Sequence, residues 1–240
     1  MIQLFNMLVL MNWCMVKITI RNYKKGKVNN MAMNGLLWQT THEGKMKGIA
    51  SIGTSCIENP FCIQRRKNND SICAKCYAQT YMKMRKSLKD HLTENANILT
   101  TRLLEGGEIP VTNANIFRFE SFGDLYNATH LQNYILICER NPFTKFGLWT
   151  KNIQILEDVF NINGIKKPDN LSIVVSSPTL NKQSVFDTDK FWFIDHVFTV
   201  YDKNTIKENN IDINCGGKDC LGCQQCYHKG TEFYIREKLK

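Results

Sequence analysis

The sequence has 240 residues, 43% hydrophobic and 22% charged, which suits one folded domain of ordinary size and excludes an intrinsically disordered chain. Its 31 Lys and Arg residues outnumber 22 Asp and Glu residues, and the resulting charge of +9 favours anionic partners, such as a phosphate-bearing ligand or nucleic acid. No apolar run reaches about 18 residues, so the sequence predicts no transmembrane helix and no membrane partner.

The amino-terminal region divides into two parts. Residues 1–14 are apolar but interrupted by polar residues, and they lack the basic start and cleavage site of a signal peptide, so we interpret them as a non-essential leader. Residues 15–47 alternate apolar and polar positions around a basic turn, which predicts an N-terminal hairpin or cap. Because ten cysteines occur without an export signal, we predict a reducing, cytoplasmic setting.

A metal-binding loop is predicted at residues 56–76, where four cysteines end in a C-x2-C hook. The four are Cys56, Cys62, Cys73 and Cys76. Thiolates that converge on one loop mainly hold a metal ion or an iron–sulfur cluster.

Five apolar runs, each followed by a polar cluster, set the predicted fold. They cover residues 48–55, 116–119, 146–149, 171–175 and 197–201, and helical periodicity fills residues 77–103, 126–140 and 153–160. From the second run on, the starts are one βα unit apart, which predicts parallel strands joined by crossovers. We therefore expect residues 48–210 to form an α/β domain, either a parallel βα-repeat barrel or a partial, TIM-like barrel.

Ligand-binding residues are expected where these strands end, because the carboxyl ends of parallel strands form one rim. Glu120 and Asp124 could hold an ammonium group or a ribose while Gly123 lets a ligand approach the backbone, or Asp124 could instead cap the helix at residue 126. The remaining candidates are Ser176 and Ser177 as hydroxyl donors, and Lys151, Asp202 and Lys203 as substrate- or anion-binding groups. Such lysines are also often simply solvated, and such serines can end a strand before a proline.

A second cysteine set lies in the tail, residues 211–240. Cys215, Cys220, Cys223 and Cys226 follow the pattern C-x4-C-x2-C-x2-C, whose last three cysteines resemble the ligand run of bacterial ferredoxins. Zinc is the alternative metal, since a structural zinc site needs only four thiolates. We expect two [4Fe-4S] clusters or zinc sites beside a common mouth, and Cys138 as a small buried hydrophobe.

Several of these segments together resemble the phage family called gene product 88. They are residues 51–78, ending Cys-Tyr-Ala, residues 118–125, the Asn-Pro pair at 141–142 with residues 146–151, and the cysteine-rich tail. The similarity covers roughly residues 48–228 and implies a phage protein that acts in the infected bacterium.

More distantly, the loop, its following aromatic residue and the Gly-acid turn are similar to radical S-adenosylmethionine enzymes. That resemblance implies that Cys62, Cys73 and Cys76 hold a [4Fe-4S] cluster with one open iron. It also implies that Glu120, Gly123, Asp124 and the two serines lie around S-adenosylmethionine, and that the tail carries an auxiliary cluster. Ten residues separate the first two of these cysteines, where the enzymes have three, so Cys56 could close the site as a fourth ligand.

Two functions follow from the sequence. The first is an iron–sulfur protein with two cysteine-bound centres that acts as a radical S-adenosylmethionine-like enzyme at the rim. The alternative is a non-enzymatic phage module in which structural zinc or iron–sulfur sites hold the fold and the basic surface binds nucleic acid or a host protein.

Overall fold

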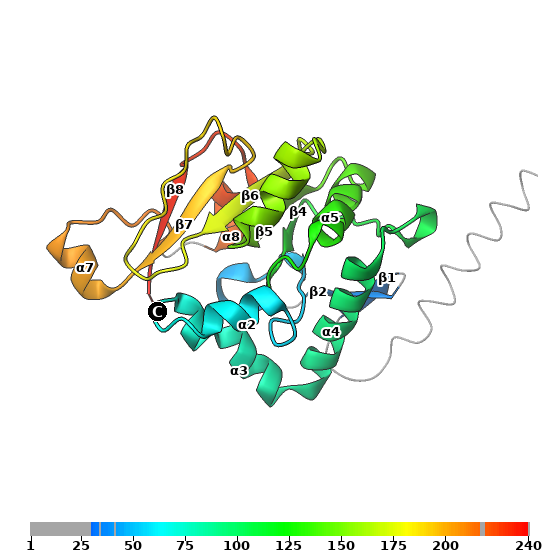
Figure 1. Ribbon diagram of the computed structural model, residues 1–240, viewed down its shortest axis with the longest axis horizontal. Coiled ribbons are helices and arrows are strands. Elements are labelled where there is room, and N and C mark those ends of the chain that lie inside the picture. Colours follow the sequence, from blue (N-terminus) through cyan, green and yellow to red (C-terminus); the bar gives the residue numbers. More distant parts are fainter. Residues whose placement is uncertain (1–29, 34, 41, 217–218, 240) are drawn as a thin grey trace, which may run out of the picture.

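The protein is a mixed α/β structure built on one mostly parallel sheet. The computed structural model describes residues 30–239 except 34, 41, 217 and 218, so the predicted leader and the first arm of the predicted hairpin lie outside the described residues. The eight strands run in sequence order across the sheet (Figure 1). They are β1 Asn30–Met33, β2 Leu36–Gln39, β3 Ala50–Ile52, β4 Ile116–Phe119, β5 Lys145–Thr150, β6 Leu171–Ser176, β7 His196–Tyr201 and β8 Tyr234–Lys238.

The pairing of the strands leaves the sheet open. Strands β1, β2 and β3 pair antiparallel, and every pair from β3–β4 to β7–β8 is parallel. No pairing joins β8 back to β1 among the described strands, so a closed barrel is not formed.

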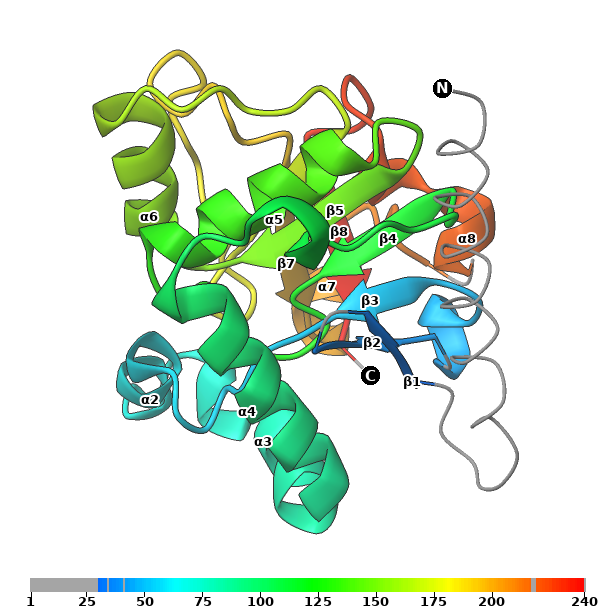
Figure 2. The ribbon, with the colours of Figure 1, turned by 90° about the vertical axis from the view of Figure 1, so that its right-hand side faces the viewer.

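Most of the helices lie on one side of this sheet, and the short helix Cys220–Cys223 lies on the other side (Figure 2). The helices are α2 Pro60–Arg66, α3 Tyr77–Met84, α4 Lys86–Thr101, α5 Ala128–Arg140, α6 Ile153–Glu157, α7 Lys203–Glu208 and α8 Cys220–Cys223. Short turns of other helix types include Gly44–Met46, Ile72–Lys75 and Gln225–Tyr227. None of the described helices is long and apolar enough to cross a membrane.

The alternation of side chains along β4 and β5 defines the two faces. Phe117, Phe119 and Phe146 point to the helix side, where Phe119 stacks on Tyr134 of α5 with ring centroids 4.1 Å apart. Residues between them, including Arg118, point to the opposite face. That second face receives the tail.

Most predicted elements are confirmed, with two corrections. The five predicted strands are present within a few residues at either end. The single helix predicted at 77–103 is wrong: Arg85 adopts an extended conformation (φ −128°, ψ 94°), so α3 ends and α4 begins there. Strand β8, which pairs along β7, was not predicted from the tail sequence.

Candidate functional site

The first cysteine set lies where β3 and β4 end. Cys56 is in the turn after β3, Cys62 is in α2, and Cys76 is the residue that precedes α3. Cys73 lies between them in the short helix Ile72–Lys75. Cys56 is 2% exposed and its Sγ lies 3.6 Å from Sδ of Met82, so it is the innermost thiol of the four.

This loop is held to the sheet by hydrogen bonds at both ends. The buried Asn59 accepts from the backbone N–H of Phe61 (2.9 Å), which caps α2, and its Nδ2 donates to the carbonyl of Asp124 (2.7 Å). At the other end, the N–H of Ile72 donates to the carbonyl of Pro178 (2.9 Å), beyond β6. The loop therefore spans the carboxyl ends of β4 and β6, as the predicted rim requires.

The thiols of this first set interact with one another. Cys56 and Cys76 influence each other's pKa, and Cys62 interacts electrostatically with Cys73 and Cys76. The interaction with Cys56 is the main cause that lowers the pKa of Cys76, and the backbone N–H groups at the start of α3 and the Lys151 ammonium lower it further. Burial and the nearby carboxylates raise the pKa of Cys62.

The second cysteine set lies on the other face of the sheet. Cys220 and Cys226 pack against Ile49 and Ile116, beside the starts of β3 and β4, and not at the rim that carries the first set. The expectation of one common mouth for both sets is therefore wrong. The physical reason is the parallel pairing of β8 with β7: the tail between them has to return to the end of the sheet where the strands start, and Cys220 and Cys226 lie on this return.

The four tail thiols also form one group. Burial is the main cause that raises the pKa of Cys226 to about 12, and Cys215, Cys220 and Cys223 all add to the increase. Lys45 reaches Cys215 from the turn before β3, with Nζ 3.6 Å from Sγ and 2.5 Å from Oε1 of Glu237 in β8. Lys45 thus connects the turn before β3 both to the tail, through Cys215, and to the edge strand β8, through Glu237.

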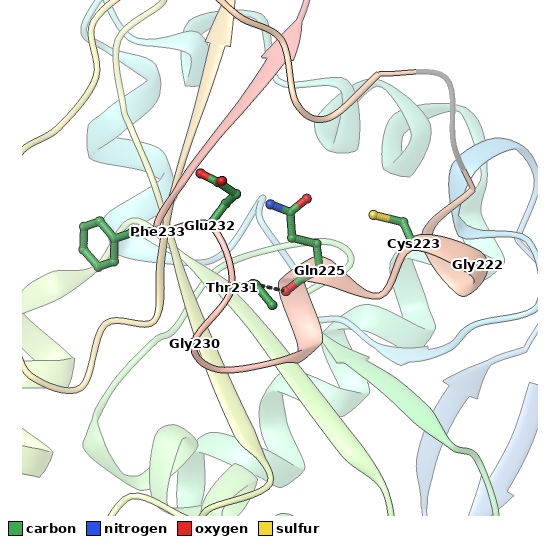
Figure 3. Close-up of a pocket in the computed structure, with 7 residues that line it drawn as sticks. All are labelled: Gly222, Cys223, Gln225, Gly230, Thr231, Glu232 and Phe233. Carbon is green, nitrogen blue, oxygen red and sulfur yellow. Dashed lines mark hydrogen bonds between the residues drawn. The ribbon is translucent and has the colours of Figure 1, made fainter.

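An open pocket of about 780 Å³ lies beside Cys223, the exposed thiol of this set. Figure 3 shows Cys223 on one side of the pocket and Phe233 on the other, with Gln225 and Glu232 between them. A second cavity, of about 520 Å³, is lined by Lys45, Lys203 and Cys215 among others. Both cavities therefore border the tail set.

The cysteines have the chemistry of metal ligands, but a preformed site is not assembled. The nine cysteines of the described chain are all free of disulfides, and eight of them form the two groups of four. Within the described residues, no three His, Cys, Asp or Glu side chains converge at the spacing of a metal site. Four thiols are nevertheless the ligand set of a structural zinc ion or a cubic iron–sulfur cluster, so the donor chemistry fits.

Glu120, at the end of β4, is engaged inside the protein. It is 3% exposed and adopts a positive φ of 55°, which directs its carboxylate towards α5. The carboxylate accepts hydrogen bonds from Tyr134 Oη (2.5 Å) and Thr54 Oγ1 (2.9 Å), and His130 Nε2 lies 3.3 Å away. A ligand at Glu120 would have to compete with these donors, so its cofactor-binding role stays a prediction.

Asp124 connects the end of β4 to the end of β5. Its carboxylate accepts from Thr150 Oγ1 and from the backbone N–H of Lys151 (3.0 Å). Helix α5 is capped by Asn127, so the interpretation of Asp124 as the helix cap is wrong. Burial raises the pKa of Asp124, although Lys151 opposes this effect.

Gly123 is required by the protein's own packing. Its φ is +88°, and a Cβ atom there would lie 2.5 Å from the carbonyl oxygen of Thr54 and 2.7 Å from Oε2 of Glu120. The space that a ligand was expected to enter is thus filled by the loop after β3.

The other predicted rim residues have separate surroundings. Ser177 hydrogen-bonds Thr199 through their hydroxyls (2.7 Å), and Ser176 is buried beside it at the end of β6. Asp202 caps α7 by accepting from the N–H of Thr205 (2.8 Å). Lys151 interacts with Cys76 of the first set, whereas Lys203 lines the cavity beside Cys215, so these two lysines do not share one site.

Sequence reasoning missed two residues that position the cysteines. Asn59 precedes Pro60, and this pair is a signal for a helix start that could have located α2 and the anchoring role of Asn59. Arg118 interacts electrostatically with Cys220 and Cys226. A single arginine inside an apolar strand gives no spacing signal that could have found it.

Comparison with known proteins identifies a family for this chain. The family described as Gene product 88 matches residues 17–237, nearly the whole chain. No curated protein and no solved structure matches.

Proposed function

Since this chain belongs to the gene product 88 family, a phage family that by itself supplies no chemistry, we propose from its own residues that it is an iron–sulfur protein. Cys56, Cys62, Cys73 and Cys76 form the first centre. The second is formed by Cys215, Cys220, Cys223 and Cys226. Each centre is a [4Fe-4S] cluster, with zinc as the alternative metal.

The observation that carries this proposal is the grouping of the thiols. Four free cysteines in each of the segments 56–76 and 215–226 influence one another's pKa, whereas Cys138 lies alone in the hydrophobic core. A packing role does not require four thiols to lie near one another twice, because their mutual repulsion opposes ionisation of each thiol and so raises its pKa. A bound cation removes that repulsion.

The experiment is anaerobic purification followed by measurement of iron, acid-labile sulfide and zinc. Cys76→Ala and Cys226→Ala are each expected to remove about half of the bound metal, because each cysteine belongs to a different centre. Cys138→Ala is the matched control and should remove none. Wild-type protein without metal, or variants at Cys76 and Cys226 that retain all of it, would refute the proposal.

A more specific proposal is that the first centre has a radical S-adenosylmethionine-like activity. It is supported by the difference between Cys56, which is buried against Met82 and Leu92, and the three more accessible thiols of Cys62, Cys73 and Cys76. In this proposal the latter three are the ligands, and Cys56 lies behind them as a hydrogen-bond donor to Cys76. A cluster with three thiolate ligands offers an open iron to S-adenosylmethionine and can pass it one electron.

The more specific proposal is tested with Cys56→Ala. This variant should keep its first cluster, and the electron paramagnetic resonance spectrum of the reduced protein should change when S-adenosylmethionine is added. Loss of the cluster would indicate a closed site with four thiolates. A spectrum that ignores S-adenosylmethionine would refute the activity and leave the metal centres standing.

The binding module remains the second candidate function. Lys83, Arg85 and Lys86 are exposed where α3 meets α4, and such a surface suits nucleic acid or an acidic host protein. Zinc without acid-labile sulfide, together with salt-dependent binding of nucleic acid, would favour this candidate. In both cases we propose that the protein acts in the cytoplasm of the infected bacterium.

A further inference from the structure

Arg118 is a partly buried cation beside the second cysteine set. It projects from β4 to the face that receives the tail, and its guanidinium carbon lies 4.0 Å from the centroid of the Trp149 ring. Its Nη1 lies 3.3 Å from Sδ of Met46, and its Nε is buried without a hydrogen-bond partner. The guanidinium therefore makes contacts with a ring and a thioether but satisfies few of its five donors.

No carboxylate neutralises Arg118. All 22 Asp and Glu residues of the sequence belong to the described part of the chain, and none of them forms an ion pair with this arginine. Its titratable neighbour from the amino-terminal side is His42, which cannot carry negative charge. A guanidinium removed from water without an anion is destabilising, so the arrangement needs a negative partner.

The tail places its thiols next to this cation. Trp149 and Met46, which contact Arg118, belong to the same packed cluster as Cys220 and Cys226. Tyr227, the residue after Cys226, packs its ring against Trp149 at 5.5 Å between centroids and against Gly147, where a Cβ atom would lie 2.9 Å from that ring. Because Gly147 has no side chain, the Tyr227 ring of the tail can pack against β5 close to Arg118.

We infer that Arg118 is the internal counter-charge of the second centre. Four thiolates around zinc or a [4Fe-4S] cluster leave roughly two net negative charges, and Arg118 supplies the positive charge that faces them. Lys45 is less suited to this role because Glu237 already pairs with it. The inference rests on the proposed function, since it requires the tail cysteines to hold a metal.

The test compares metal release from Arg118→Met, Arg118→Lys and wild-type protein. With a chelator in excess, Arg118→Met should release about half of its metal at least about tenfold faster than wild type, because one of two centres has lost its counter-charge. Arg118→Lys keeps the charge and should stay near the wild-type rate. Arg66→Met is the matched control, because Arg66 donates to the carbonyl of Cys56 in the first set and should leave the second centre unchanged.

A second measurement separates counter-charge from packing. In the metal-loaded protein Arg118→Met should lower the melting temperature, whereas in the metal-free protein it should leave the melting temperature unchanged or raise it. An equal decrease in both forms, or unchanged metal release, would overturn the inference. If Arg118→Met does not fold, Arg118→Gln replaces it as the neutral variant, and release from it at the rate of Arg118→Lys would overturn the inference equally.

The wild-type measurement keeps the two claims apart. A wild-type protein that binds no metal refutes the proposed function and the inference with it. A wild-type protein that binds metal at both sets, with release insensitive to Arg118, refutes the inference alone.

Discussion

Replacing Gly123 by alanine tests how the first cysteine set is held. The positive φ of +88° is strained for a residue with a side chain, and this strain costs about 1–2 kcal/mol. The new Cβ atom would also lie 2.5 Å from the Thr54 carbonyl oxygen, and such overpacking costs about 1–3 kcal/mol. Together these effects predict a loss of about 2–5 kcal/mol in the free energy of unfolding.

Gly164 provides the matched control. Its φ is also positive, at +63°, but no atom lies within 4 Å of a Cβ built there. Gly164→Ala should therefore show only the backbone strain of about 1–2 kcal/mol. The assay is urea denaturation of anaerobic protein, with metal content measured on the same samples.

The contact between Gly123 and Thr54 also links stability to the metal loop, because Thr54 precedes Cys56 by two residues. Gly123→Ala should lose metal from the first centre, whereas Gly164→Ala should keep both centres. If Gly123→Ala costs no more than Gly164→Ala and retains all its metal, the close packing of this turn does not hold the loop.

Two further predictions concern charges outside the cysteine sets. The Nζ atom of the buried Lys167 lies 2.5 Å from the carboxylate of Asp195, so Asp195→Asn leaves this ammonium without its partner. The variant should lose about 3–5 kcal/mol in the free energy of unfolding, measured by urea denaturation, and the double variant with Lys167→Met should recover most of this loss. A single variant as stable as wild type would contradict the prediction. The hydrogen bond from Arg102 lowers the pKa of Glu108 from 4.5 to about 2, so its contribution to stability is present above pH 4.5 and is lost as the pH falls towards 2. At low salt, the melting temperature of Glu108→Gln should therefore depend less on pH between these values than the melting temperature of the wild type. An unchanged pH dependence would argue against this ion pair.

The sequence reveals the strands β4 to β7 because most of their residues are buried. All six residues of β6 are buried, and its sequence is apolar apart from Ser172 and Ser176. Strand β8 escapes this reasoning: its sequence is Tyr-Ile-Arg-Glu-Lys, and only Ile235 is fully buried, because β8 lies at the edge of the sheet. The charged residues of β8 interrupt the apolar pattern by which a strand is predicted.

The break between α3 and α4 also leaves no local signal. The apolar periodicity continues through residues 77–103, and Arg85 is an ordinary helix former. Tertiary packing separates the two helices. Ala78 and Met82 of α3 pack against Cys56, whereas Asn95 of α4 hydrogen-bonds the backbone of β2. Both cysteine sets were found in the sequence by spacing. Their separate positions, one where β3 and β4 end and the other beside the starts of these strands, follow from the route of the chain, which spacing does not encode.

Strand β4 contributes residues that contact both cysteine sets. On the face that receives the tail, Ile116 and Arg118 meet the second cysteine set. At its carboxyl end, Glu120 and Asp124 meet the loop of the first set through Thr54 and Asn59. A rigid strand therefore fixes both sets relative to one another, because neither set can shift along β4 without breaking its hydrogen bonds or its packing against the sheet.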